Sequence, residues 1–208
     1  MNASPSAADG GNPFSTRYVR PGAIPYLFPP GENVSSVVGR LAANGWRGQI
    51  VGPHGAGKST LLAAMLPAIE ATGRLVVLVE LHDGERRLPE LKKETFYFFE
   101  KVECPLFSRV LVIDGYEQLP WWRRWCLKRQ CRRRGMGLLV TSHHSVGLPL
   151  VFRVEVDAES ARRVVAKLLA GRPIILTEQD VDRSLARHGR NLRETLFELY
   201  DLFEQRSK

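Results

Sequence analysis

Residues 52–60, GPHGAGKST, stand between the apolar run GQIV (48–51) and the apolar segment LLAAML (61–66). Glycines allow the backbone to adopt positive φ angles and let its N–H groups approach an anion where a Cβ would clash. A helix that starts directly after the loop points its unpaired N–H groups at the same anion. The pattern G-x-x-x-x-G-K-[ST] is satisfied at each of its fixed positions by Gly52, Gly57, Lys58 and Ser59. The stretch therefore predicts a strand, a phosphate-binding loop and a helix.

Composition limits what the chain can be. Hydrophobic residues make up 44% of the 208 residues, which is enough for a core of ordinary size. No apolar run approaches the ~20 residues that a membrane helix needs, and residues 1–20 contain no apolar signal core. The 3 cysteines show neither a disulfide framework nor metal-ligand spacing. We therefore expect a cytoplasmic protein, and the formal net charge of +8 favours an anionic partner.

Apolar runs typical of buried strands alternate with helical patterns along most of the chain. The strands are predicted at 48–52, 74–81, 109–115, 137–143 and 149–156, and the main helices at 32–45, 59–73, 120–135, 157–171 and 192–205. Residues 82–108 fit either a helix or a strand. Continuous apolar strands that alternate with helices favour a mostly parallel five-stranded sheet covered on both faces.

Three parts of the chain differ in character. Residues 1–31 are first polar and Gly-rich, then rich in proline and aromatic residues, and predict a flexible N-terminal arm. Residues 32–156 hold the strands and the glycine loop, and predict a nucleotide-binding α/β domain. Residues 157–208 become helical, with capping boxes at TEQD (177–180) and NLRE (191–194), and predict a small lid-like helical region.

With the glycine-loop pattern, the sequence resembles the P-loop NTPase superfamily, and residues 52–59 resemble its Walker A element. The resemblance implies that Lys58 and the loop backbone hold the phosphates during catalysis, and that the Ser59 hydroxyl ligates Mg²⁺. It places the whole loop at the nucleotide: Gly52, Pro53, His54, Gly55, Ala56, Gly57, Lys58, Ser59 and Thr60. His54 either touches a phosphate or faces solvent. The alternative for the stretch is an ordinary Gly-rich turn between a strand and a helix.

A magnesium nucleotide needs a second anchor for the metal, and the superfamily places an aspartate at the end of an apolar strand. The run VLVID (110–114) supplies Asp114 at this position. The resemblance therefore implies that Ser59 and Asp114 hold Mg²⁺ together. A turn-forming aspartate beside Gly115 is the alternative.

Hydrolysis also needs a base that orients and deprotonates water. Many ATP-hydrolysing members of the superfamily carry a glutamate directly after the aspartate, where this chain has Gly115. A small residue there, with an acidic residue three positions after the aspartate, resembles the STAND (NACHT-like) branch of signalling ATPases. Glu117 is therefore the predicted catalytic base. Its alternative role is a surface carboxylate that the dipole of the following helix favours.

Other features favour the AAA+ and STAND branches, and ATP over GTP. An additional strand, 74–81, lies between the glycine loop and Asp114, and no Asn/Thr-Lys-x-Asp motif for guanine occurs in the chain. In AAA+ and STAND proteins the fourth strand ends in a polar sensor of the γ-phosphate. By that resemblance Thr141 and Ser142 contact the nucleotide and His143 takes part in catalysis. Polar residues that face water at a strand end are the alternative.

The C-terminal helices resemble the small helical lid of AAA+ proteins. In that lid an arginine near the start of a helix reaches the nucleotide, and Arg193 matches this position best, with Arg190 as its neighbour. The planar, permanently charged guanidinium suits phosphate binding. An exposed helix arginine is the alternative.

The segment PWWRRWCLKRQCRRRG (120–135) predicts a strongly basic helix. Its cationic residues are Arg123, Arg124, Lys128, Arg129, Arg132, Arg133 and Arg134. Helical spacing places Trp122, Trp125 and Arg129 near one face, so we expect the tryptophans to pack partly on the domain. Such a helix can bind nucleic acid through phosphates and stacked bases, dock on an acidic protein or a membrane surface, or stay a solvated face.

Three functions fit these residues. The first is Mg²⁺-dependent ATP hydrolysis coupled to movement of the C-terminal helices. The second is a switch that binds ATP, scarcely hydrolyses it and contacts nucleic acid or a protein through residues 120–135. The third is a kinase for a small molecule, which the inserted strand and the arginines directly after Asp114 disfavour. We expect an α/β P-loop three-layer sandwich with ATP and Mg²⁺ as ligands, and favour the first function.

Overall fold

The computed structural model describes residues 11–81, 108–172, 175–189 and 191–207. These residues form one parallel sheet with the strand order β2-β3-β4-β1-β5. Its strands are β1 (Arg47–Val51), β2 (Leu75–Glu80), β3 (Arg109–Asp114), β4 (Gly137–Ser142) and β5 (Leu150–Arg153). The prediction of an α/β fold with a five-stranded, mostly parallel sheet is confirmed. The ambiguous segment 82–108 lies outside the described residues except at its last position.

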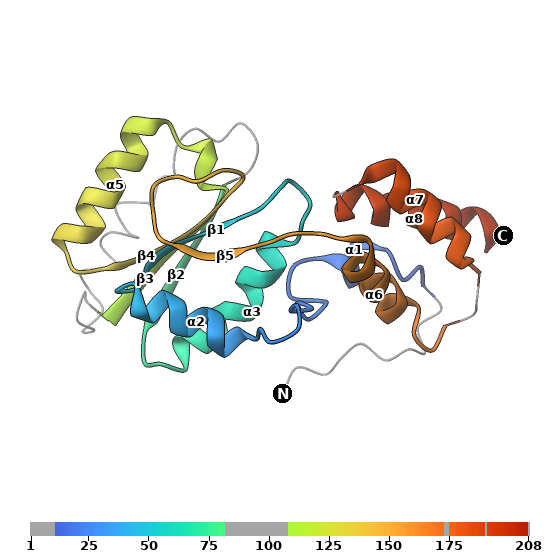
Figure 1. Ribbon diagram of the computed structural model, residues 1–208, viewed down its shortest axis with the longest axis horizontal. Helices are drawn as coiled ribbons and strands as arrows, with labels where there is room; N and C mark the ends of the chain where they lie inside the picture. The colour runs from blue at the N-terminus through green and yellow to red at the C-terminus, as the bar shows by residue number, and fades with distance from the viewer. Residues whose placement is uncertain (1–10, 82–107, 173–174, 190, 208) are drawn as a thin grey trace.

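Helices cover both faces of the sheet and continue into a separate C-terminal group (Figure 1). The helical elements are α1 (Thr16–Val19), α2 (Val34–Ala43), α3 (Lys58–Glu70), the 3-10 helix η2 (Tyr116–Gln118), α5 (Trp121–Arg133), α6 (Ala158–Leu169), α7 (Glu178–His188) and α8 (Leu192–Arg206). Among the described helices, not one has both the length and the hydrophobicity that crossing a membrane requires.

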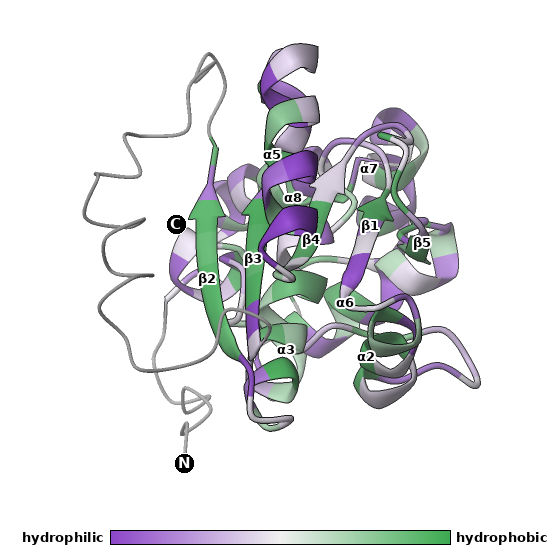
Figure 2. Ribbon diagram, turned by 90° about the vertical axis from the view of Figure 1, so that its left-hand side faces the viewer, coloured by the Kyte–Doolittle hydropathy of each residue, from purple (hydrophilic) through white to green (hydrophobic). Residues whose placement is uncertain are grey.

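The alternation of side chains along β3 explains the three layers. Val110 and Val112 belong to the hydrophobic core shared with α2 and α3. Leu111 and Ile113 belong to the second core, under α5. Successive side chains of a strand point to opposite faces, so a strand that is apolar at every position must be covered on both sides. Figure 2 shows β3 as hydrophobic along most of its length.

The tryptophans of α5 pack on the domain less than we expected, and Trp122 alone is about half-buried. Trp121, Trp122 and Trp125 are 74%, 48% and 58% exposed. The helix buries Leu127 and Cys131 instead, and these two residues lie one turn apart against the second core. Because the smaller apolar residues already fill the contact with the sheet, the indoles occupy the outer face.

Asn12 and Phe14, in the segment predicted as a flexible arm, pack against α8, whereas Tyr26 and Phe28 of the same segment contact Phe152 on β5. The Asn12 Nδ2 atom donates hydrogen bonds to the Tyr200 carbonyl oxygen (3.0 Å) and to Glu204 Oε1 (2.8 Å). Phe14 is 1% exposed and meets Phe203 edge to face, with 6.4 Å between the ring centroids. Burial of aromatic rings in this segment offsets the entropy cost of ordering it.

The C-terminal helices are fixed to each other by a buried carboxylate. Asp180, on α7, accepts hydrogen bonds from both terminal nitrogens of Arg206 at 2.6 and 2.9 Å, and from the Thr177 hydroxyl at 2.6 Å. These donors hold the pKa of Asp180 well below its usual range. The ion pair joins the start of α7 to the end of α8, so the two helices form one unit.

Candidate functional site

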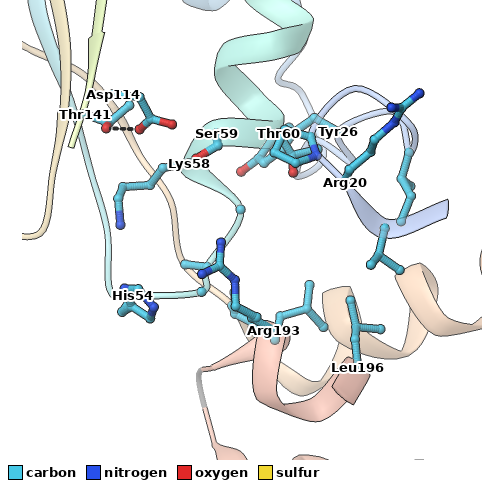
Figure 3. A pocket seen from close by; sticks show the side chains of 18 of the residues that line it. Arg20, Tyr26, His54, Lys58, Ser59, Thr60, Asp114, Thr141, Arg193 and Leu196 are labelled. Atoms are coloured by element: carbon cyan, nitrogen blue, oxygen red, sulfur yellow. Dashed lines mark hydrogen bonds between the residues drawn. The ribbon is translucent and has the colours of Figure 1, made fainter. Parts of the chain in front are cut away.

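A cavity of about 590 Å³ lies where the glycine loop meets the carboxyl ends of β3 and β4. Residues 54–60 form one wall and the C-terminal helices form another, while residues 16–27 close a third side (Figure 3). Ligands of parallel α/β sheets bind at this edge, and the volume is in the range of small-molecule sites. The cavity is therefore large enough for a nucleotide.

The glycine loop has the backbone geometry that anion binding needs. Gly55 and Gly57 have φ angles of +70° and +96°, which side chains with a Cβ rarely adopt. Gly57 directly precedes the first residue of α3, so the unpaired N–H groups of this helix face the loop. At Gly52 a Cβ would lie 2.5 Å from the Val154 carbonyl oxygen, because the strands β1 and β5 approach closely there. Each of these glycines is required by the local geometry.

Lys58 is the buried cation of the loop. Its side chain is 9% exposed, and its Nζ atom donates to the carbonyl oxygens of Gly52 and Pro53, each at 2.8 Å. Burial lowers the pKa of Lys58 from its usual value, while the charges of Glu117 and Asp114 oppose this shift. The ammonium group lies beside acidic residues at the edge of the cavity, where an anionic ligand can compete for its hydrogen bonds.

Asp114 and Ser59 both line the cavity, and Figure 3 shows them beside Lys58. The Thr141 hydroxyl donates a hydrogen bond to Asp114 Oδ1 and accepts one from the Gly115 backbone N–H at 2.9 Å. Thr141 is fully buried, so it fixes the aspartate carboxylate. A hydroxyl and a carboxylate are hard oxygen donors, and they fit a Mg²⁺ ion that takes its remaining ligands from phosphates and water.

Glu117 lies beside His143 at the carboxyl ends of β3 and β4. The distance between His143 Nε2 and Glu117 Oε1 is 3.2 Å, and the rings of His54 and His143 meet edge to face with centroids 5.6 Å apart. The other carboxylate oxygen, Glu117 Oε2, is buried and has no hydrogen-bond partner within the described part of the chain. A buried carboxylate oxygen without a partner is costly unless a ligand or water satisfies it.

Burial lowers the pKa of His143, the charge of Glu117 opposes this shift, and Lys58 and the neighbouring histidines add to it. The ring is therefore neutral at pH 7 and protonates only below its ordinary pKa of about 6.5. The unfolded chain takes up this proton first, so the contribution of His143 to stability is present above a pH of about 6.5 and is lost progressively as the pH falls below it, towards the lower pKa of the folded state.

If Glu117 acts as a base, phosphate release is expected to fall at acidic pH, because a protonated His143 pairs with the Glu117 carboxylate. The variant His143→Asn is expected to keep its activity to lower pH. The measurement is the rate of phosphate release at saturating ATP between pH of about 5 and about 8. An identical acidic limb in both proteins would show that His143 does not control this carboxylate.

The C-terminal helices contact the glycine loop through the start of α8. A Cβ at Gly55 would lie 1.9 Å from Asn191 Oδ1 and 3.1 Å from Arg193 Cβ. Asn191 is the N-cap of α8, and its Oδ1 accepts from the Glu194 backbone N–H at 3.4 Å. Arg193 lines the cavity, and Figure 3 shows its guanidinium beside the loop. The lid-like region and the loop are thus in direct contact.

Gly55→Ala is expected to raise the dissociation constant for ATP about tenfold, because the new methyl group pushes Asn191 away and the positive φ adds about 1 kcal/mol of strain. Gly73→Ala is the matched control: its φ is +81°, and a Cβ there meets nothing within 4 Å. Calorimetric titration of both variants with an ATP analogue makes the comparison. Equal affinities in the two variants would argue against lid contact at Gly55.

Most predicted site residues line the cavity: His54, Gly55, Ala56, Gly57, Lys58, Ser59, Thr60, Asp114, Glu117, Thr141, His143 and Arg193. Gly52 and Pro53 contribute carbonyl oxygens to Lys58 from behind the loop. Ser142 is not among the lining residues. Its hydroxyl is buried and donates to the His144 carbonyl oxygen at 2.6 Å, which fixes the turn after β4.

Sequence reasoning missed two walls of the cavity. Residues 16–27, with Tyr26 facing Gly57, close one side, and burial raises the pKa of Tyr26 to about 12. The proline and aromatic content of this segment was the available signal. Glu80 also lines the cavity, because it ends β2 directly opposite Asp114 in the sheet register. Glu80 lies at the end of a predicted strand, and this position could have indicated that it reaches the cavity.

No protein-family model matches the sequence, and no curated protein matches it. The architecture and the glycine loop define the P-loop NTPase fold. Among solved structures, the chain is similar in fold to the replication initiator DnaA bound to AMPPCP and single-stranded DNA. The two are 17% identical with a TM-score of 0.56, and the match covers 88% of this chain and 64% of that chain. The fold is that of AAA+ proteins.

Two further structures give the same result. AMPPCP-bound DnaA from Aquifex aeolicus is 19% identical with a TM-score of 0.56, over 84% of this chain and 62% of that one. A DNA replication initiation factor is 16% identical with a TM-score of 0.56, over 88% and 66%. The chain thus spans less than two thirds of the length of each of these proteins. The resemblance to the AAA+ branch is confirmed as a likeness of fold.

Proposed function

We propose that this protein binds ATP with Mg²⁺ and hydrolyses it to ADP and phosphate. The observation that carries the proposal is the unpartnered Glu117 Oε2 atom, which is buried beside a cavity that the glycine loop, Lys58 and Asp114 also line. The two DnaA structures of similar fold hold AMPPCP, an ATP analogue, which supports an adenine nucleotide as the ligand.

In this proposal the phosphates lie against the loop backbone and the N-terminus of α3. Lys58 exchanges its bonds to the Gly52 and Pro53 carbonyl oxygens for bonds to phosphate oxygens, which are charge-assisted and therefore stronger. Arg193 approaches the phosphates from α8. The base and ribose occupy the apolar part of the cavity, between Tyr26 and the α8 residues Leu192 and Leu196.

Ser59 and Asp114 are the proposed Mg²⁺ ligands, and Thr141 keeps the Asp114 carboxylate oriented. The metal ion, when bound, neutralises charge on the phosphate oxygens. Because Thr141 is fully buried and also holds the Gly115 backbone N–H, it couples the position of Asp114 to the turn that leads to Glu117.

Glu117 is the proposed base for hydrolysis. Its Oε2 atom accepts a proton from a water molecule as the water oxygen forms a bond to the γ-phosphorus. The bond between this phosphorus and the β–γ bridging oxygen breaks, and the products are ADP and phosphate. His143, which contacts Oε1, holds the carboxylate in place. Loss of the γ-phosphate changes the charge beside Gly55 and Arg193, so the C-terminal helices respond to hydrolysis.

The second candidate is a switch that binds ATP and scarcely hydrolyses it. The 3.2 Å contact between His143 Nε2 and Glu117 Oε1 favours this candidate, because it leaves only one of the two carboxylate oxygens, Oε2, open to water. Gly115 also occupies the position where many ATP-hydrolysing P-loop proteins have glutamate.

Two assays on the purified chain separate the candidates. Calorimetric titration with AMPPCP and Mg²⁺ measures binding, and free phosphate release from ATP measures hydrolysis. Binding with release supports the ATPase, whereas binding without release supports the switch. Phosphate that appears in a small-molecule acceptor instead of in solution would indicate a kinase. No binding of the analogue would contradict both proposals.

A further inference from the structure

The outer face of α5 presents aromatic and cationic side chains together. Three tryptophans and three arginines on this helix are exposed, and we call them the α5 surface: Trp121, Trp122, Trp125, Arg129, Arg132 and Arg133. The α5 sequence contains no acidic residue that would neutralise the arginines. In Figure 1, α5 lies at the opposite end of the molecule from α7 and α8. A large aromatic area of this kind, exposed next to fixed positive charge, is typical of an interaction site.

Helical geometry interleaves the two kinds of side chain. Residues four apart lie one above the other on a helix, so Trp121 and Trp125 form one row, and Arg129 continues close to it. The Arg129 guanidinium carbon lies 5.6 Å from the centre of the Trp125 ring. The Arg123 guanidinium carbon lies 4.7 Å from the centre of the Trp122 ring. Trp122 and Trp125 therefore each have a cation beside the ring, and these contacts restrict the orientation of the two rings.

A cationic hollow continues the α5 surface toward the loop before β5. Its volume is about 410 Å³, and Trp125 forms part of its rim. The charged side chains that line it are all cationic: Arg47, Lys128, Arg129 and Arg132. Burial, together with the neighbouring charges of Arg124 and Arg47, lowers the pKa of Lys128. The cations repel one another here, so binding of an anion in the hollow relieves an unfavourable arrangement.

We propose that the α5 surface binds single-stranded nucleic acid. Unpaired bases stack on Trp121 and Trp125, and the phosphates of the same strand lie along the adjacent arginines and in the cationic hollow. Alternating bases and phosphates match alternating indoles and guanidiniums, which is the arrangement that binds single strands without sequence preference. The bases of a duplex are stacked on each other, so a duplex can use the arginines but not the exposed indoles.

An anionic membrane is a poorer match for the same side chains. A helix that lies on a bilayer puts its apolar residues on one face and its cations on the other. In α5 the aliphatic residue Leu127 is buried against the sheet, whereas the tryptophans share the outer face with arginines. The indoles cannot enter the hydrocarbon region without taking guanidinium groups with them, and that is unfavourable.

The test uses the full chain and a fluorescein-labelled oligonucleotide of about 20 thymidines, titrated by anisotropy at about 50 and about 200 mM salt. Trp125→Ala is expected to raise the dissociation constant about tenfold, and Trp125→Phe to restore most of the affinity, because an aromatic face is worth about 1–3 kcal/mol per stacked base. Quenching of tryptophan fluorescence on binding is the direct signature of stacking.

The cationic part is tested through the salt dependence. Arg129→Gln is expected to reduce the slope of log K against log salt by about 0.7, the value for one phosphate of a single strand. Lys167→Gln is the matched control, since Lys167 is exposed on α6, away from the α5 surface, and its replacement is expected to leave the slope unchanged.

Three outcomes would overturn the proposal: affinity for a duplex of the same length that equals the affinity for the single strand, binding that favours phosphatidylserine vesicles, or affinity unaltered by Trp125→Ala. The inference goes beyond the proposed nucleotide function and does not depend on it. Lys58→Ala is expected to bind the oligonucleotide like the wild type in the absence of ATP. A failure of the proposed nucleotide binding can therefore be distinguished from a failure of the proposed oligonucleotide binding.

Discussion

Lys58→Ala is expected to lower the affinity for ATP by about two orders of magnitude. The ammonium group is the buried cation of the glycine loop, and charge-assisted hydrogen bonds contribute about 1.5–3 kcal/mol each. The alanine variant loses two such donors, because Nζ already makes two hydrogen bonds to carbonyl oxygens at 2.8 Å and can direct the same hydrogens to phosphate. Calorimetric titration with AMPPCP measures binding without interference from hydrolysis.

The alanine variant also loses the apolar contacts of the long lysine side chain, so this loss must be separated from the loss of the ammonium group that donates to the Gly52 and Pro53 carbonyl oxygens. Lys58→Met keeps the length and apolar contacts of the side chain and removes only the ammonium group. The same loss of affinity is expected in both variants. Unchanged affinity in the methionine variant would show that Lys58 does not bind phosphate.

Glu117→Gln is expected to reduce phosphate release by about 10²–10⁴-fold, the usual contribution of a general base, and to leave AMPPCP binding almost unchanged. Glutamine has nearly the same shape as glutamate, so the contact with His143 is preserved while the ability to accept a proton is lost. The readout is single-turnover hydrolysis of ATP, which separates the chemical step from product release.

Glu80 provides the matched control for this prediction. It carries the same charge, lines the same cavity and ends the neighbouring strand opposite Asp114. Glu80→Gln is expected to change the hydrolysis rate less than tenfold, if Glu117 is the base. The reverse pattern, with loss of activity in the Glu80 variant alone, would move the role of base to Glu80.

The sheet was predictable because its signal is local. In VLVID the four residues before Asp114 are all apolar. Such an unbroken apolar run is typical of a strand that is covered on both faces. The carboxyl ends of parallel strands meet at one edge, so the glycine loop, Asp114 and Thr141 were expected to come together, and they do.

The contacts that sequence reasoning missed join parts of the chain that are far apart. Nothing local in residues 11–31 indicates that Asn12 and Phe14 have partners on α8. The contact between Glu117 and His143 likewise depends on how the turns after β3 and β4 approach each other. For α5 the sequence correctly predicted a helix, but it predicted the wrong buried face. The hydrophobicity of tryptophan suggested that the indoles are buried, whereas Leu127 is the residue that packs against the sheet.

The packing of Asn12 and Phe14 against α8 has a consequence for the time at which the cavity forms. The hydrogen bond from Asn12 to the Tyr200 carbonyl oxygen spans 188 positions of the chain. At the usual rates of protein synthesis this distance is a delay of roughly 10–40 seconds between the emergence of the two partners from the ribosome. During that delay a nascent chain can form its sheet but lacks the wall of the cavity that α8 supplies, so a captured ligand would mark a chain in which α8 has been made.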